Sequence, residues 1–391
     1  MKMLNEAKEL IQDNIRDYGM YIALFIIMLT FSVMTDGLFM SSRNISNLLD
    51  SAGYIAVLAV GVMLVIVIRH IDLSIGFLAG FLGAIAAILL MQAGLPVYLT
   101  IPTILILGTI IGLCTGFLVA QLGIPAFVAT LAGMLIFRGA LLLVTEKTGT
   151  IIVQNDAFNA IGNGYIPSIM QVNGLHLLSL LVGLMGIIFY VYSALSSRKN
   201  KIKYKFDVVS MEIFVLQLLF VSAIIAYITW ILAGYNGFSW TVIVLLVIVS
   251  IYHFFTTKTV LGRHIYAVGS NPEAAHLSGI NVKKITYLVF GSMGMLAAVS
   301  GILFTARLQS ATTTAGTLFE LDAIAAAYVG GVSSAGGVGK VTGAIVGAIV
   351  MASLINGMNL LGVGISYQYI IRGAVLVLAV IFDVTTRKRG K

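Results

Sequence analysis

The chain has 391 residues, of which 59% are hydrophobic and only 10% charged, and its mean hydropathy is +1.04. Soluble domains carry about a quarter charged residues, so this composition excludes a soluble globular protein. In lipid every backbone N–H and C=O must be bonded within the protein, which leaves helices or a closed barrel. Long continuous apolar runs favour helices over the alternating pattern of a barrel. The fold class predicted is therefore all-α, a polytopic integral membrane helical bundle.

Residues 1–17 are polar and no small-residue cleavage site follows the first apolar run, so we expect that run to remain as an anchor. Twelve membrane segments are predicted, and ten would also satisfy the charge pattern discussed next. The segments are 18–35, 53–69, 73–92, 97–117, 125–145, 174–194, 212–233, 240–257, 284–306, 319–334, 341–361 and 368–384. The segment 319–334 is short for a span, which is compatible with a re-entrant segment.

Lys and Arg residues set the predicted orientation. Most of the 23 fall in alternate loops and in the two tails if the N-terminus is inside, which places both termini in the cytoplasm. The net charge of +8 therefore indicates topology rather than nucleic-acid binding. The basic inner loop 195–211 is interpreted as a topology signal that also attracts anionic membrane lipid.

A short capped helix is predicted in the inner loop 258–283. Asn271 suits the N-cap, Pro272 the first helical position and Glu273 the first turn, while Gly279 suits a left-handed ending. The helix, about 272–278, carries Ala274, Ala275 and Leu277 on a surface without an obvious partner in the chain. Such a helix fits a groove of another protein, or is an ordinary loop helix on the membrane surface, and the residues alone favour neither.

The run Glu273-Ala274-Ala275 followed by Gly279 resembles the cytoplasmic coupling-helix motif of ABC importer permeases. The wider run 262–280 is similar to the ribose/xylose/galactose branch of that family. Three further stretches in chain order are similar to the same branch: 71–76, 124–131 with Arg138-Gly139, and 320–326 with the glycine pairs up to Gly339. The resemblance implies that a partner ATPase is coupled through Asn271, Pro272, Glu273, Ala274, Ala275 and Gly279.

The resemblance covers most of the chain, which we interpret as one permease domain, 1–391, with the coupling helix at about 271–279. Residues 174–233 are extra relative to the shorter ribose-type permeases and add two spans. The longer xylose and multiple-monosaccharide permeases are similar here, which favours that subgroup.

Polar residues in apolar surroundings are the candidates for a translocation path. Asp72 and Ser74 follow Arg69 and His70 between two apolar runs. They fit either a tight inner turn in which Asp72 caps the next helix, which we favour, or a broken helix beside the path.

Asn356 and Asn359, three residues apart, share one helix face and should point into the bundle. They would bond a neighbouring helix, the commoner use, or a sugar hydroxyl. Glu320, Asp322 and Arg307 are interpreted as end caps and an exposed ion pair.

The sequence shows no pattern of catalytic, metal-binding or nucleotide-binding residues. The run around Gly339-Lys340 fails the phosphate-loop pattern, because Ser334 stands where Gly is needed and Val341 where Ser or Thr is needed. The histidines are scattered without metal-ligand spacing. We therefore expect no catalytic residues, no metal, no cofactor and no ATP binding by this chain, so the protein is not an enzyme.

The predicted function is the permease subunit of an ATP-driven importer of a monosaccharide such as xylose or galactose. It would lie multi-pass in the bacterial cytoplasmic (inner) membrane. The partners implied by the resemblance are an ABC ATPase subunit, an extracytoplasmic sugar-binding protein and a second permease chain, as a homodimer. The first alternative is an ABC permease for a nucleoside or a branched-chain amino acid. The second is an ion-coupled secondary transporter, which is disfavoured because the acids lie mostly at span ends. The third is a membrane enzyme, for which no catalytic group is visible in the sequence.

Overall fold

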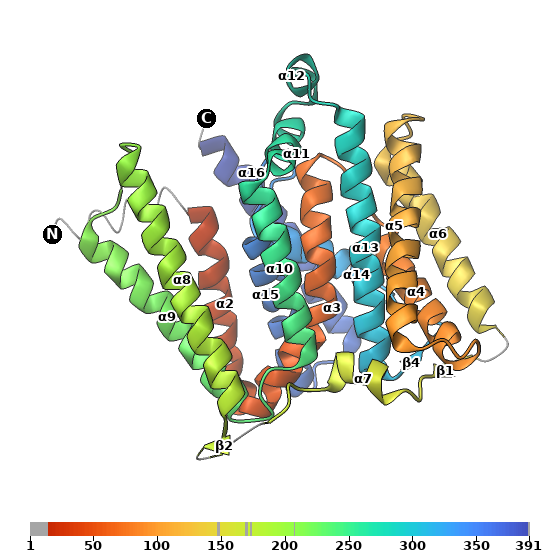
Figure 1. Ribbon diagram of the computed structural model, residues 1–391, viewed down its shortest axis with the longest axis horizontal. Coiled ribbons are helices and arrows are strands. Elements are labelled where there is room, and N and C mark those ends of the chain that lie inside the picture. The colour runs from red at the N-terminus through yellow and green to blue at the C-terminus, as the bar shows by residue number, and fades with distance from the viewer. Residues whose placement is uncertain (1–14, 147–148, 169–170, 173, 207, 390–391) are drawn as a thin grey trace.

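The computed structural model describes residues 15–146, 149–168, 171–172, 174–206 and 208–389, and these form a helical bundle (Figure 1). The all-α membrane fold class is confirmed. Each of the twelve predicted segments coincides with a helix. These helices are α2 (Ile15–Met34), α3 (Ser42–Val67), α4 (Ile75–Met91), α5 (Val97–Ala120), α6 (Ala126–Thr145), α8 (Leu177–Lys203), α9 (Met211–Ala233), α10 (Trp240–Lys258), α13 (Val282–Leu308), α14 (Phe319–Val329), α15 (Val341–Leu360) and α16 (Ile365–Arg389).

Nine of the described helices are long and apolar enough to cross a membrane. The other three of the twelve are α2, α4 and α14. With 11 residues, α14 rises about 16 Å, half of a hydrocarbon core about 30 Å thick. The number of spans and the cytoplasmic position of the termini stay predictions, and the polar residues 1–14 lie outside the described residues.

Short elements occupy the two ends of the bundle. α7 (Asp156–Asn163), β1 (Ile151–Ile152) and β4 (Ser310–Ala311) lie at one end, and α11 (Val260–Ser270) leads to α12 (Pro272–Leu277) at the other (Figure 1). We call these the α7 end and the α12 end. The remaining short elements are η1 (Leu38–Met40), β2 (Gln171–Val172) and β3 (Leu175–His176).

The described residues between α6 and α8 contain folded structure. β1 pairs antiparallel with β4, with Ile151 opposite Ala311. Asn155 starts α7 by accepting the backbone N–H of Phe158 at 3.0 Å, and the Phe158 ring is fully buried. The loop is therefore packed onto the bundle at the α7 end.

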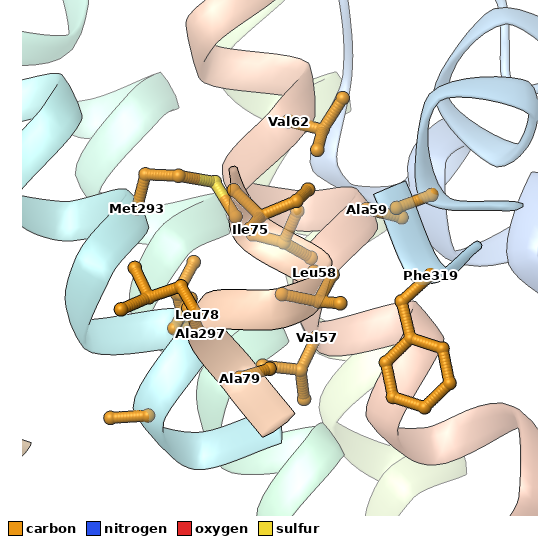
Figure 2. Close-up of a cluster of buried hydrophobic side chains, with 14 of the residues drawn as sticks. Val57, Leu58, Ala59, Val62, Ile75, Leu78, Ala79, Met293, Ala297 and Phe319 are labelled. Carbon is orange, nitrogen blue, oxygen red and sulfur yellow. The ribbon is translucent and has the colours of Figure 1, made fainter. Parts of the chain in front are cut away.

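The core lies where α3, α4 and α13 meet. In the most apolar stretch of α3, 83% of the residues are buried, and in α13 72%. Figure 2 shows Val57 and Leu58 of α3 beside Leu78 and Ala79 of α4, with Ala297 of α13 close by.

Glycine permits the close approach of α13 to α5 and α4, because a Cβ at Gly294 or Gly301 of α13 would clash with the carbonyl oxygen of Gly108 on α5 or of Ala79 on α4, respectively.

The segment 174–233 forms a helical hairpin, α8 and α9, at the edge of the bundle (Figure 1). Only 11% of the apolar stretch of each helix is buried. Arg198 joins them at the α12 end by donating to Val209 O at 2.9 Å and by lying over the Phe214 ring at 4.7 Å. That the hairpin is an addition to a shorter permease, and that the chain is one domain, remain predictions.

Candidate functional site

The short helix predicted at about 272–278 is present as α12, and its two ends are fixed by capping residues. Asn271 Oδ1 accepts the backbone N–H groups of Glu273 at 3.1 Å and of Ala274 at 3.0 Å. Pro272 occupies the first turn, where its missing N–H costs nothing. Gly279 follows the helix at φ +82°, the left-handed conformation predicted for it. The helix therefore holds its shape through local bonds, beyond the ends of the neighbouring helices (Figure 1).

The surface of α12 differs from the predicted one at one position. Ala275 is buried and belongs to the main hydrophobic core, because it faces back toward the bundle. Its assignment to a docking surface is corrected on this ground. Glu273, Ala274 and His276 are exposed, and Leu277, at 87%, is the most exposed large hydrophobic side chain of the described residues.

The end of α11, just before α12, is fixed to the end of α3. Arg69 Nε donates to Gly269 O at 2.6 Å and Arg69 Nη2 donates to Ser270 O. A Cβ at Gly269 would clash with Val67 O, so only glycine allows this contact. Arg69 is thus more than a topology charge.

The glycine-rich turn between α14 and α15 joins the same contact. Gly337 N–H donates to Val67 O at 2.8 Å, and Tyr266 of α11 donates its hydroxyl to Gly339 O at 2.7 Å. Three segments distant in sequence therefore meet backbone to backbone below α12.

The segment 68–74 between α3 and α4 is not the tight turn that we favoured. Seven residues separate the end of α3 at Val67 from the start of α4 at Ile75, and they cross part of the bundle in a non-helical conformation. His70 lies 5.9 Å from the Phe290 ring, two turns into α13. With 17 residues, α4 rises about 26 Å, less than a hydrocarbon core about 30 Å thick.

Asp72 nevertheless organises the start of α4. It is 5% exposed, and its Oδ1 accepts the backbone N–H of Ser74 at 2.9 Å and the Ser74 hydroxyl at 2.6 Å. Both bonds are local, so the pair has a positioning role in the break, and its place on a translocation path stays a prediction.

Asn356 and Asn359 line one cavity of about 250 Å³. The cavity lies between α3, α14, α15 and α16, and we call it the Tyr54 cavity. Its lining residues are Leu48, Ser51, Ala52, Tyr54, Ile55, Thr317, Phe319, Asp322, Ala348, Met351, Ala352, Ile355, Asn356, Asn359 and Arg372. Neither Asp72 nor Ser74 lines it, so the four candidate path residues do not form one site.

The two asparagines differ in what their amides bind. Asn356 and Asn44 exchange hydrogen bonds of 2.9 and 3.1 Å, which joins α15 to α3. Asn359 Oδ1 accepts from Gln368 Nε2 at 2.8 Å. Asn356 therefore forms a contact between two helices. The bond from Gln368 uses only the oxygen of Asn359 and leaves its NH₂ group out.

The ion pairs differ from the exposed one that we expected. Arg307 pairs with the buried Asp50 of α3 at 3.6 Å. Asp322 pairs with Arg372 of α16 at 3.3 Å. Glu320, expected at an exposed helix end, is 5% exposed, and its Oε2 is buried without a hydrogen-bond partner among the described residues.

Sequence reasoning missed Tyr54 and Arg372 of this cavity. Tyr54 stacks in a group with Phe304 and Phe319, at ring distances of 5.1 and 4.9 Å, and no sequence spacing indicates such a group. Arg372 did carry a signal, because an Arg within an apolar helix marks a functional position by default.

Comparison with known proteins agrees with this arrangement. A family model described as branched-chain amino acid transport system / permease component matches residues 44–380. The xylose transport system permease protein of Haemophilus influenzae is 39% identical over 376 residues, which cover 96% of this chain and 98% of that protein. The same protein of Escherichia coli K12 is 39% identical over 377 residues, covering 96% and 94%. The ribose import permease protein of Haemophilus influenzae is 34% identical over 366 residues, covering 93% and 91%. No solved structure matches this chain.

Proposed function

The chain belongs to the family of branched-chain amino acid transport system permease components, and from this premise we propose that it is the permease of an ATP-driven monosaccharide importer with a xylose-like substrate. It is a multi-pass protein of the bacterial inner membrane. The observation that carries the sugar assignment is the 39% identity to xylose permeases along 96% of the chain. The family description favours a second candidate, a branched-chain amino acid.

Permeases of this family act with an ATPase subunit and a periplasmic binding protein. We assign the ATPase contact to the exposed face of α12, where Glu273, Ala274 and Leu277 project from the bundle. The contacts of Arg69 and Gly269 then carry movement of α12 to α3. ATP is hydrolysed by the partner, and this chain supplies alternating access.

The glycine-rich run after α14 supports the absence of a nucleotide site here. Gly336 and Gly337 approach Val67 O and the end of α11 so closely that a Cβ at either would clash. Their backbone is used in packing, whereas a phosphate loop must leave its N–H groups free for phosphate.

We propose that a second copy of the chain packs against the face of the bundle on which the Tyr54 cavity opens. Ser51, Thr317 and Asn359 are exposed there, although they lie on or beside helices of the membrane bundle. Polar groups at this depth avoid lipid and line water-filled paths. A homodimer that encloses such a path satisfies them, and lipid then covers the apolar faces of α6, α8 and α9.

The test is import by the reconstituted transporter, with the permease, its ATPase and its binding protein in proteoliposomes. Labelled xylose, ribose, galactose and leucine are offered separately, with and without internal ATP. We expect ATP-dependent import of at least one pentose or hexose and none of leucine. ATP-dependent leucine import alone would establish the second candidate, and import by the permease without the ATPase would refute the ATP-driven mechanism.

A further inference from the structure

We propose that the Tyr54 cavity is a monosaccharide subsite of the transport path, a proposal that rests on the function above. Arg372, Asp322 and Asn359 would bind sugar hydroxyls, and the rings of Tyr54 and Phe319 would cover an apolar face of the sugar. Nothing in the sequence resemblance or in the names of the relatives assigns this cavity.

The cavity has the size and chemistry of a small neutral polar ligand. Its volume of about 250 Å³ is below the range of roughly 300–1,000 Å³ that holds drug-sized molecules. Its lining includes two aromatic rings, Tyr54 and Phe319, whose centroids lie 4.9 Å apart, and the Asp322–Arg372 ion pair. A monosaccharide can use both the aromatic rings and the charged pair, since it has C–H groups on its faces and hydroxyl groups around its edge.

The polar groups have unused hydrogen-bonding capacity. A guanidinium has five N–H donors, and the contacts of Arg372 with Asp322 use Nη1 alone, at 3.3 and 3.5 Å. Asn359 uses its oxygen for Gln368, which leaves two amide donors. Asn356, by contrast, uses its amide oxygen and one amide N–H for Asn44, which fixes the wall.

The position of the cavity fits delivery from the α7 end. Arg69 places the end of α3 beside α11, so Ser51, in the first half of α3, lies toward the α7 end, and Tyr54 lies at the midpoint of the helix. Asn359 is next to the last residue of α15, and Arg372 lies two turns into α16. Under the proposed function, sugar released from the binding protein reaches this cavity before the breaks at 68–74 and 330–340.

The charges of the cavity favour a neutral ligand over an ion. Asp322 and Arg372 neutralise each other, so a ligand with one net charge would be left unpaired in a poorly solvated site. A zwitterionic amino acid would have to separate the pair, whereas a sugar hydroxyl donates to the carboxylate and accepts from the guanidinium without separating them.

The experiment uses cysteine protection in the full transporter. Cys114, the single cysteine, lies on α5 away from the cavity, so Cys114→Ala gives the background. Thr317→Cys places a thiol in the cavity lining, and Thr314→Cys, in the same loop but outside the lining, is the matched control. We expect saturating xylose to slow thiol modification of Thr317→Cys several-fold and to leave Thr314→Cys unchanged.

A transport arm adds a second readout. Asn359→Leu should reduce xylose import by about tenfold, the effect of losing one ligand hydrogen bond, while binding-protein-stimulated ATP hydrolysis is retained. Wild-type import with no sugar protection and no Asn359→Leu effect would overturn the subsite alone. Protection by leucine instead of xylose would overturn it in favour of an amino acid. Failure of the wild-type transporter to import any monosaccharide would overturn the proposed function itself.

Discussion

Replacing Arg69 with Ala removes the two side-chain hydrogen bonds that hold the end of α11 against the end of α3. A hydrogen bond from a charged donor contributes about 1.5–3 kcal/mol. Because Arg69 is exposed, the lower figure applies to each bond, which gives about 3 kcal/mol for the two. Local opening of residues 268–271 should then become roughly a hundredfold more frequent. Capping of α12 by Asn271 is independent of Arg69, so ATPase binding should be retained while coupling falls.

Hydrogen exchange of the amides in 268–271, measured by mass spectrometry on the reconstituted transporter, reports the opening directly. Sugar imported per ATP hydrolysed reports the coupling. Arg263→Ala is the matched control, because Arg263 is also exposed, lies on α11, the helix that Arg69 holds, and forms no side-chain hydrogen bond with the described residues. Unchanged exchange and unchanged coupling in Arg69→Ala would show that the contact does not transmit movement.

Three further changes test other parts of the structure. Leu277→Asp should weaken ATPase capture in pull-down by roughly tenfold or more, since burying a Leu contributes about 1.5–3 kcal/mol, and should leave the melting temperature of the isolated permease unchanged; equal capture would contradict the assigned face. Gly347→Val should prevent the close packing of α15 on α14, because a Cβ there clashes with Ala326 O, and a size-exclusion profile in detergent should show loss of the monodisperse protein; a wild-type profile would contradict it. Asp50→Ala should leave Arg307 without its partner and lower stability by about 3 kcal/mol, measured as a fall in melting temperature, and an unchanged midpoint would show that the pair contributes nothing.

The position of α12 could be predicted from the sequence because it depends on local capping chemistry. Asn271, Pro272 and Gly279 each act through bonds or dihedral angles within a few residues, so their spacing alone located α12 within one residue. The burial of Ala275 was not accessible in the same way, because it depends on how α12 leans against α13, which is a tertiary contact.

The break after α3 shows the limit of hydropathy as a guide. Charges at Arg69 and Asp72 ordinarily mark the end of a span, which is why a tight turn was favoured. In the structure, seven non-helical residues join the two helices, Gly269 and Gly337 contact Val67 O just before them, and Thr130 donates its hydroxyl to Ile71 O at 3.3 Å. Those partners are 59 or more residues away and leave no local pattern.

The prediction of the ion pairs was wrong for a related reason. Arg307 was matched with acids that follow it closely in the chain, whereas its partner is Asp50, on a helix that begins the core. Pairing in a membrane bundle follows which helices are neighbours, and α13 lies against α3. The Tyr54 cavity needed the same knowledge of neighbours, since its walls come from four helices.

At the junction of Val67, Gly269 and Gly337 the backbones of three segments touch, and the Arg69 side chain bonds across it. A contact between two backbones cannot adjust by changing side-chain rotamers, so its geometry stays fixed when neighbouring segments move. We therefore expect movement of α12 to carry the ends of α3 and α11 and the turn before α15 with it as one rigid unit. Under the proposed function, the bending that accompanies a tilt of α12 is therefore expected beyond these contacts, in the non-helical residues 70–74 that lead into α4.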